Sequence, residues 1–309
     1  MKPLYTAFLA LAALCLVAFA VMLLAGYSSG VEPAVVGFFV AFAIGVRRLP
    51  VLREFAFTTW IFAAVSAAMF YPELFLRVGD FELKRLIVPL IQVIMFGMGT
   101  ALSFGDFARV VKMPKGVFIG ALCQYTIMPL IGVTLALTFG FPPEIAAGVV
   151  LIGSAPGGVA SNVMAYIAGA NLPLSVTLTA VSTILSPFVT PALMMLLAGQ
   201  FVPIDFVDMM MTIVNMVILP VGAGLVFNRF FHGKLPWLDR AMPVVTMVGI
   251  AVIITIITAT GRDSLLVVGP LLVVAAIIHN GAGYGLGYWA ARLLGMPEQD
   301  CRTIAIEVG

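Results

Sequence analysis

The sequence predicts an all-α protein that crosses a membrane many times. Of its 309 residues, 62% are hydrophobic and only 10% are charged, whereas roughly 25% of the residues of a soluble domain are charged. The mean hydropathy is +1.15. One long apolar segment is also interrupted in its middle by proline and glycines, as in transporters that contain discontinuous helices. These three observations predict an all-α polytopic transporter.

The apolar segments are long enough to be membrane spans. A helix needs about 20 apolar residues to cross the hydrocarbon core. The predicted spans are residues 4–26, 33–46, 54–72, 84–104, 115–140, 144–169, 172–198, 207–230, 241–260 and 264–294. The segment 33–46 is short for a span. A further segment begins near Glu298 and reaches Gly309.

Basic residues between the spans predict the orientation. If successive spans alternate in direction, one side receives Arg47, Arg48, Arg53, Arg109, Lys112, Lys115, Arg229, Lys234, Arg240 and Arg292. The other side receives chiefly Arg77, Lys84, Arg85 and Arg262. The richer side is predicted to be cytoplasmic, which places the N-terminus in the cytoplasm. We expect the membrane to be a bacterial inner membrane. Residues 1–50 then form an extra N-terminal hairpin. The alternative, a cleaved signal peptide, has an apolar core of only about 7–15 residues.

The interruption lies within the segment 144–169. It reads Gly153-Ser154-Ala155-Pro156-Gly157-Gly158-Val159-Ala160-Ser161-Asn162. Proline lacks an N–H and clashes with the preceding turn, and glycine loosens the backbone. The predicted break exposes carbonyls on one side and N–H groups on the other. The first end suits a cation, whereas the N–H groups of Gly158, Val159 and Ala160, with Asn162 beside them, suit a substrate carboxylate or sulfate.

An internal repeat is indicated by the end of the chain. Phe139-Gly140-Phe141-Pro142-Pro143-Glu144 resembles Leu294-Gly295-Met296-Pro297-Glu298, and Glu144 precedes Gly153 by the same interval as Glu298 precedes Glu307. Five helices separate the two segments, so the copies run in opposite directions, which is typical of inverted-repeat transporters. The predicted first repeat is 51–198, with five helices including the broken one. The second is 199–309 and is incomplete because it ends at its own break.

Oxygen-bearing side chains gather around the predicted break. They are Gln124, Ser161, Asn162, Ser175, Thr179 and Glu307. Ser175 and Thr179 are four residues apart and share one helix face. Hydroxyl, amide and carboxylate oxygens are ligands for hard cations, so sodium is the expected coupling ion.

Each of these residues also has a structural interpretation. Serine and threonine often bond to a carbonyl of their own helix, Gln124 can bridge two helices, and Asn162 can cap the second half-helix. Glu307 differs, because an intramembrane charge costs about 2.5–3.5 kcal/mol and usually marks an ion or proton pathway. If Glu307 carries a proton, the protein is instead a proton-coupled or uniporting transporter.

Other classes of function find little support. The two histidines and scattered carboxylates form no catalytic constellation, so we do not expect an enzyme. There is no Walker A or Rossmann motif, and hence no sign of ATP-driven transport or of an organic cofactor. A dispersed net charge of +2 does not suggest nucleic acid, and no obligate protein partner is evident. A passive channel or a sensor that does not transport is a further alternative.

Several motifs resemble those of the bile acid/sodium symporter family. They are Val93-Ile94-Met95-Phe96-Gly97-Met98-Gly99, Gln124 with Ile127-Met128-Pro129, Pro156-Gly157-Gly158 with Ala160-Ser161-Asn162-Val163-Met164, Ser182-Thr183, Ser186-Pro187, Thr190-Pro191, His279-Asn280-Gly281 and Ile306-Glu307-Val308-Gly309. The resemblance implies a core domain with two crossing broken helices, a panel domain, and sodium-coupled transport of a bile-acid-like or smaller anion. It also implies two sodium sites. One uses Ser161, Asn162, Ser175, Thr179 and Glu307, and the other uses Gln124, Glu307 and the backbone of Val308.

Two departures from the family pattern are present. Relatives often carry threonine where this chain has Val159, so a hydroxyl contact to substrate is absent. Relatives continue after Glu-Val-Gly with Met-Gln-Asn, whereas this sequence stops at Gly309. The resemblance therefore implies a C-terminal truncation, and an inactive fragment is an alternative to a working transporter.

Overall fold

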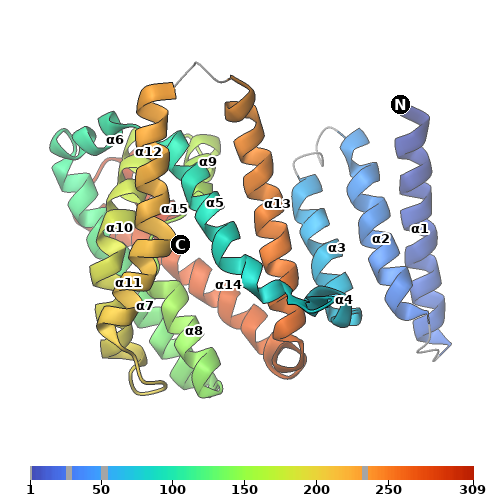
Figure 1. The fold of residues 1–309 in the computed structure, drawn as a ribbon. Coiled ribbons are helices and arrows are strands. Elements are labelled where there is room, and N and C mark those ends of the chain that lie inside the picture. The colour runs from blue at the N-terminus through green and yellow to red at the C-terminus, as the bar shows by residue number, and fades with distance from the viewer. Residues whose placement is uncertain (1, 26–29, 50–54, 232–235) are drawn as a thin grey trace. The chain divides into compact units, whose positions relative to one another are not determined.

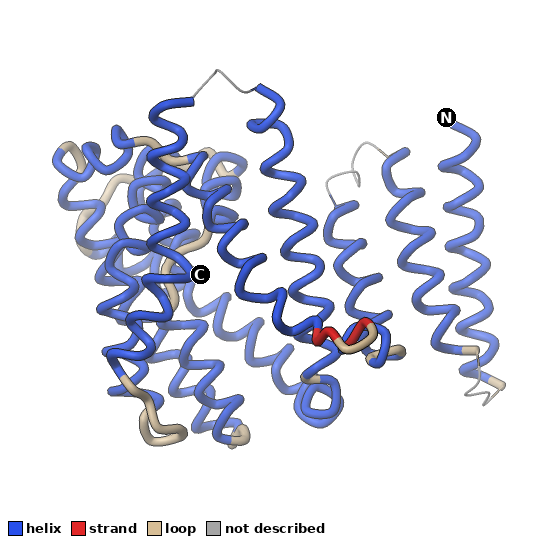
Figure 2. The backbone as a smooth tube through the Cα atoms, in the orientation of Figure 1, coloured by secondary structure: helices blue, strands red, loops and turns tan. Residues whose placement is uncertain are grey.

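The computed structural model describes residues 2–25, 30–49, 55–231 and 236–309. Nearly all of this described chain is helical, apart from one short hairpin of two strands, which is red in Figure 2. Strands β1 (Arg77–Val78) and β2 (Phe81–Glu82) are antiparallel, with Arg77 opposite Glu82. Seven helices of the described chain are long and apolar enough to cross a membrane. The prediction of an all-α polytopic membrane protein is confirmed.

The chain forms two compact units, each built from two stretches of sequence. The first contains Met1–Ile94 and Pro236–Val267. Its helices are α1 (Lys2–Leu24), α2 (Val31–Gly45), η1 (Val46–Arg48), α3 (Ala56–Phe70), α4 (Glu73–Leu76), η3 (Leu83–Leu86) and α13 (Pro236–Thr260). Helix α1 packs on α2, α2 on α3, and α3 on α13 (Figure 1). The buried side chains of Ala12, Ala41 and Ala43 let α1 and α2 approach closely.

The second unit contains Met95–Leu235 and Val268–Gly309, so two of the three boundaries between the units fall within helices. These helices are α5 (Ile87–Ala101) and α14 (Arg262–Leu293). The others are α6 (Phe104–Ala108), η4 (Arg109–Val111), α7 (Pro114–Phe139), α8 (Pro143–Ser154), α9 (Val159–Ile167), α10 (Leu172–Leu193), η5 (Met194–Ala198), α11 (Phe206–Ile213), η6 (Val214–Ile218), α12 (Leu219–Phe231) and α15 (Glu298–Val308). The repeat boundaries at 51–198 and 199–309 stay a prediction.

Prolines and glycines set many of the helix ends in this unit. Pro114 opens α7 and Pro143 opens α8, because the first helical N–H needs no partner and proline has the right φ. Gly140, after α7, and Gly295, after α14, have φ of 61° and 70°, a left-handed conformation that favours glycine. The predicted break of segment 144–169 is confirmed, since α8 ends at Ser154 and α9 begins at Val159.

Several predicted spans differ in detail from the observed helices. The predicted span 207–230 corresponds to one span, Phe206–Phe231, but a π-helical turn, η6, lies within it between α11 and α12. Pro220 cannot donate to the carbonyl of Met216, which favours a wider turn there. A similar turn, η5, ends the segment 172–198. The segment 84–104 begins with a 3₁₀ turn, and α5 ends at Ala101. Residues 26 and 54, at two predicted boundaries, lie outside the described residues.

A buried cluster joins α7, α10, α14 and α15. It includes Cys123 of α7, Leu174 and Leu178 of α10, and Ile304 and Val308 of α15. Helix α15 contributes Cys301, Ile304 and Val308 to this cluster. Its apolar residues anchor it against α7 and α10. This packing places the end of α15 beside the break between α8 and α9.

Candidate functional site

The helix break is an extended segment that links α8 to α9. Ala155 has φ −76° and ψ 154°, and Gly158 has φ −99° and ψ 160°. Ala155 precedes Pro156, and a residue before proline is disfavoured in the helical region. The chain therefore leaves the helix at Ala155 and resumes it at Val159. The backbone groups that the break releases need partners from elsewhere in the protein.

Side chains of α7 and α10 supply those partners. Thr190 Oγ1 donates to the carbonyl of Ser154 at 2.7 Å, and Gln124 Nε2 donates to the carbonyl of Ala155 at 3.1 Å. The N–H of Gly157 donates to Ser182 Oγ at 3.2 Å. Gly158 O accepts from the backbone N–H of Ser161 at 3.1 Å and lies 2.6 Å from Ser161 Oγ. The break is thus a fixed element with its own hydrogen bonds.

A buried carboxylate connects α15 to this break. Glu307 is only 8% exposed. Its Oε1 accepts from the hydroxyls of Ser161, at 2.7 Å, and Ser175. Its Oε2 accepts from Thr179 Oγ1 at 3.1 Å. Asn162 Oδ1 lies 2.7 Å from Ser175 Oγ and 3.4 Å from Thr179 Oγ1, where it is an alternative acceptor for the same hydroxyl protons. The five residues that the family resemblance implies for a first sodium site therefore form one hydrogen-bonded cluster.

Gln124 lies next to this cluster but is not bonded to Glu307. Its Oε1 is the only buried side-chain polar atom of the described chain that lacks a hydrogen-bond partner. A cavity of about 10 Å³ lies between Gln124, Ser182 and Glu307, which is about the space that one water-sized group needs. Val308 is buried and is the last residue of α15.

The residues predicted to bind substrate lie at the start of α9. Gly158 precedes the helix without a side-chain cap, and Ala160 is exposed. The N–H groups of Val159 and Ala160 belong to the first turn, where they have no helical acceptor. Asn162 is half-buried and turns its carbonyl oxygen toward Ser175 and Thr179. Asn162 thus belongs to the oxygen cluster and lies close to the N–H groups.

Three residues whose hydrogen bonds hold the helix break in place were not singled out as site residues from the sequence. They are Tyr125, Ser182 and Thr190. Ser182 holds Gly157, Thr190 holds Ser154, and Tyr125 donates to the carbonyl of Ser182 at 2.7 Å. The Ser182-Thr183 and Thr190-Pro191 pairs were the available signal. Nothing in their spacing distinguishes them from Thr183, whose hydroxyl bonds only its own helix at 2.7 Å.

Gly157 is a position where the backbone approaches the carboxylate. A Cβ atom there would lie 2.9 Å from Glu307 Oε2. Only glycine lets the extended segment pass this close without moving Glu307. In the described chain, no group of three His, Cys, Asp or Glu side chains is arranged to hold a metal ion. The cluster therefore offers hydroxyl, amide and backbone oxygens around one carboxylate.

Known proteins resemble this chain over most of its length. Residues 88–268 match the model of the Sodium Bile acid symporter family. An uncharacterized sodium-dependent transporter of Bacillus subtilis, YocS, is 38% identical over 85% of this chain and 81% of its own length. The chain belongs to the sodium/bile acid symporter family. The resemblance inferred from the sequence motifs is confirmed.

Other relatives of this symporter family come from plastids and animals. The probable sodium/metabolite cotransporter BASS1 of Arabidopsis thaliana chloroplasts is 35% identical over 71% of this chain. The ileal sodium/bile acid cotransporter of Oryctolagus cuniculus is 33% identical over 74% of this chain. The matches span 55% and 66% of those two proteins. The family consists of sodium-dependent transport proteins rather than enzymes. This confirms the expectation that the protein is not an enzyme.

Proposed function

We propose that this protein couples sodium to the transport of an organic anion across the cytoplasmic membrane by alternating access. The observation that carries the proposal is the buried Glu307 carboxylate, which gathers hydroxyls from Ser161, Ser175 and Thr179. Family membership supports sodium as the ion. The proposed mode of transport is symport. A bile-acid-like anion, or a smaller carboxylate or sulfate, is the class of substrate that suits the neighbouring helix start.

The first sodium site uses Ser161, Asn162, Ser175, Thr179 and Glu307. Their hydroxyls donate to Glu307, and the same oxygens have lone pairs that can turn toward a cation. One carboxylate among neutral oxygens favours monovalent ions over divalent ones, and the bound anion supplies the second negative charge that two sodium ions require. The second site uses the unpartnered oxygen of Gln124, Glu307 and the carbonyl of Val308. Glu307 is shared between the two sites.

The anion binds at the start of α9, against the N–H groups of Gly158, Val159 and Ala160 and beside Asn162. A helix N-terminus carries a partial positive charge and free N–H donors. Ser161 and Asn162 belong to this same turn and also to the first sodium site. Sodium bound there fixes the turn that presents the N–H groups, so each ligand increases the affinity for the other.

Transport requires the site to open to each side in turn. We propose that the helix break and α15 are related by the inverted repeat and belong to one core domain. This core domain moves against a panel domain. Inverted repeats around a central site provide such motion in other transporters. The distribution of Arg and Lys supports a cytoplasmic N-terminus in a bacterial inner membrane.

Uptake into proteoliposomes tests the proposed function. Radiolabelled taurocholate and a panel of smaller carboxylates and sulfates are offered with sodium or with choline outside. We expect at least one anion to accumulate only with sodium, at the same external pH. Equal uptake in both salts contradicts sodium coupling. Uptake driven by an imposed pH gradient in choline favours proton coupling through Glu307 instead.

A charge placed in the first turn of α9 tests the anion site. In Ala160→Asp, the new carboxylate occupies the N–H groups and repels an anionic substrate. We expect anion uptake to fall more than about tenfold, the effect of a loss of ~1.4 kcal/mol in binding. Ala160 is exposed, so the change has little effect on packing.

Ala160→Asn is the matched control for this variant. Asparagine has nearly the same shape as aspartate and can also cap the helix, but it carries no charge. We expect it to keep most of the uptake. Equal losses in the two variants would mean that size, and not charge, matters at this position, and would contradict the proposed anion site.

A further inference from the structure

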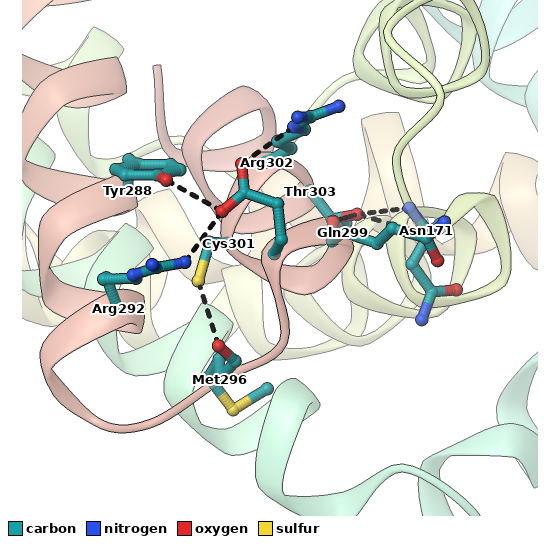
Figure 3. Close-up of polar contacts among 9 residues, drawn as sticks. Asn171, Tyr288, Arg292, Met296, Gln299, Cys301, Arg302 and Thr303 are labelled. Carbon is teal, nitrogen blue, oxygen red and sulfur yellow. Dashed lines mark hydrogen bonds and ion pairs between the residues drawn. The ribbon is translucent and has the colours of Figure 1, made fainter.

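Asn171 uses three polar groups, one to cap the start of α10 and two to bind α15. Its side-chain oxygen caps α10 by accepting from the N–H of Leu174 at 3.2 Å. Its Nδ2 donates to Asp300 Oδ1 at 2.7 Å. Its backbone N–H donates to Thr303 Oγ1 at 2.8 Å, and Figure 3 shows Asn171 and Thr303 facing each other. A single residue therefore fixes a helix start and binds a second helix.

One helical turn later, these contacts continue into the Glu307 cluster. Ser175 follows Asn171 by four residues and Glu307 follows Thr303 by four residues. The Ser175 hydroxyl donates to Glu307 Oε1, and Thr179, another turn along α10, donates to Oε2 at 3.1 Å. Residues four apart lie on the same face of a helix. Helices α10 and α15 are thus joined by a ladder that begins at Asn171 and ends at Glu307.

The first turn of α15 is held separately by an ion-pair cluster. Glu298 Oε2 accepts from Tyr288 and from Arg292, each at 2.9 Å, and Oε1 accepts from Arg302 at 3.0 Å (Figure 3). The hydrogen bonds from Tyr288 and Arg302 hold the pKa of Glu298 below its usual value. The side chains of Arg292, Glu298 and Arg302 are exposed, so their ion pairs contribute little to stability. Thr303, in contrast, is fully buried.

We infer that Asn171 and Thr303 are positioning residues that set the register of α15 against α10, and thereby the affinity of the Glu307 cluster for sodium. The inference rests on the proposed sodium site. A shift of α15 by one residue moves Glu307 by about 1.5 Å along the axis. Such a shift breaks hydrogen bonds of ordinary length, and it separates the oxygens that have to meet at one ion.

Thr303→Val tests this role, because valine has nearly the shape of threonine and removes only the hydroxyl. We expect the half-saturating sodium concentration for uptake to rise about three- to tenfold, the effect of one lost hydrogen bond. Maximal uptake at saturating sodium should be the same as in the unaltered protein. Thr303→Ser keeps the hydroxyl and should restore the normal sodium dependence.

Thr177→Val is a closely matched control. Both threonines are fully buried. Thr177 donates to Pro173 O at 2.7 Å and lies 3.3 Å from Asp106 O, while Thr303 donates to Gln299 O at 2.9 Å and lies 3.3 Å from Asn171 O. In the part of the chain that the structure describes, no hydrogen bond joins Thr177 to α15. We expect Thr177→Val to leave the sodium dependence unchanged.

A charge exchange provides a second test that does not touch the buried hydroxyl. Asn171→Asp keeps the oxygen that caps α10 but places a carboxylate against Asp300, and should raise the half-saturating sodium concentration. The double variant Asn171→Asp/Asp300→Asn restores a donor and an acceptor in reversed order, and should recover sodium affinity. Folding of each variant is followed by size-exclusion chromatography.

The outcomes separate this inference from the proposed function. Sodium-independent uptake by the unaltered protein contradicts the proposed function itself. If unaltered uptake depends on sodium and Ser175→Ala weakens that dependence, while Thr303→Val and Asn171→Asp do not, the positioning role is wrong. Should Thr303→Val fail to fold, the charge exchange decides: absence of recovery in the folded double variant overturns the inference.

Discussion

Sodium-stimulated uptake is expected to fall at least about a hundredfold when Glu307 is replaced by glutamine. Glu307 carries the only formal charge of the cluster with Ser161, Ser175 and Thr179. Removing one partner of a buried charge pair costs about 3–5 kcal/mol, and each 1.4 kcal/mol changes an affinity tenfold. The measurement is initial uptake into proteoliposomes over a range of sodium concentrations.

Glu144→Gln is the control for the loss of a carboxylate. Glu144 is exposed in the first turn of α8 and belongs to the same unit. Its replacement should leave the sodium dependence unchanged. Uptake by Glu307→Gln that still responds to sodium with near-normal affinity would contradict both proposed sodium sites, because they share this residue.

The second large effect is expected from Gly153→Ala, which should markedly lower the melting temperature of the protein. A Cβ at Gly153 would contact the carbonyl oxygen of Met128 and lie 2.7 Å from its carbon and 3.1 Å from Pro129 N. These are backbone atoms of α7 and cannot rotate away. Overpacking a close contact costs about 1–3 kcal/mol, and we expect a value near the upper end. Heating followed by size-exclusion chromatography measures the loss.

Gly148→Ala is the corresponding control on the same helix. A Cβ there would meet no atom within 4 Å, and alanine is favoured over glycine in a helix. The variant should be as stable as the unaltered protein or more so. If Gly153→Ala is equally stable, the close crossing of α7 and α8 at Met128 is incorrect.

The break itself was predictable from the sequence because its chemistry is local. Pro156 removes a donor, Ala155 is driven out of the helical region, and Gly157 admits the carboxylate, so the order of residues almost specifies the segment. The π-helical turn of η6 was less predictable. Pro220 permits either a kink or a wider turn, and packing selects between them.

The oxygen cluster was predictable only in part. Its members were found because a polar residue in an apolar segment is conspicuous, and Glu307 most of all. The partners of the break were missed because Ser182 and Thr190 look like the many hydroxyls that bond their own helix. Asn171 and Thr303 are 132 residues apart, and only the fold brings them together.

The Glu307 cluster also has a consequence for how the protein is made. Its hydroxyls and its carboxylate lie 128 to 146 residues apart in the chain. A polypeptide is synthesised from its N-terminus, so Ser161, Ser175 and Thr179 enter the bilayer well before Glu307 leaves the ribosome. Until then, their hydroxyls bond to their own helices or to water. Insertion of α15 is therefore the step that completes the Glu307 cluster during biogenesis.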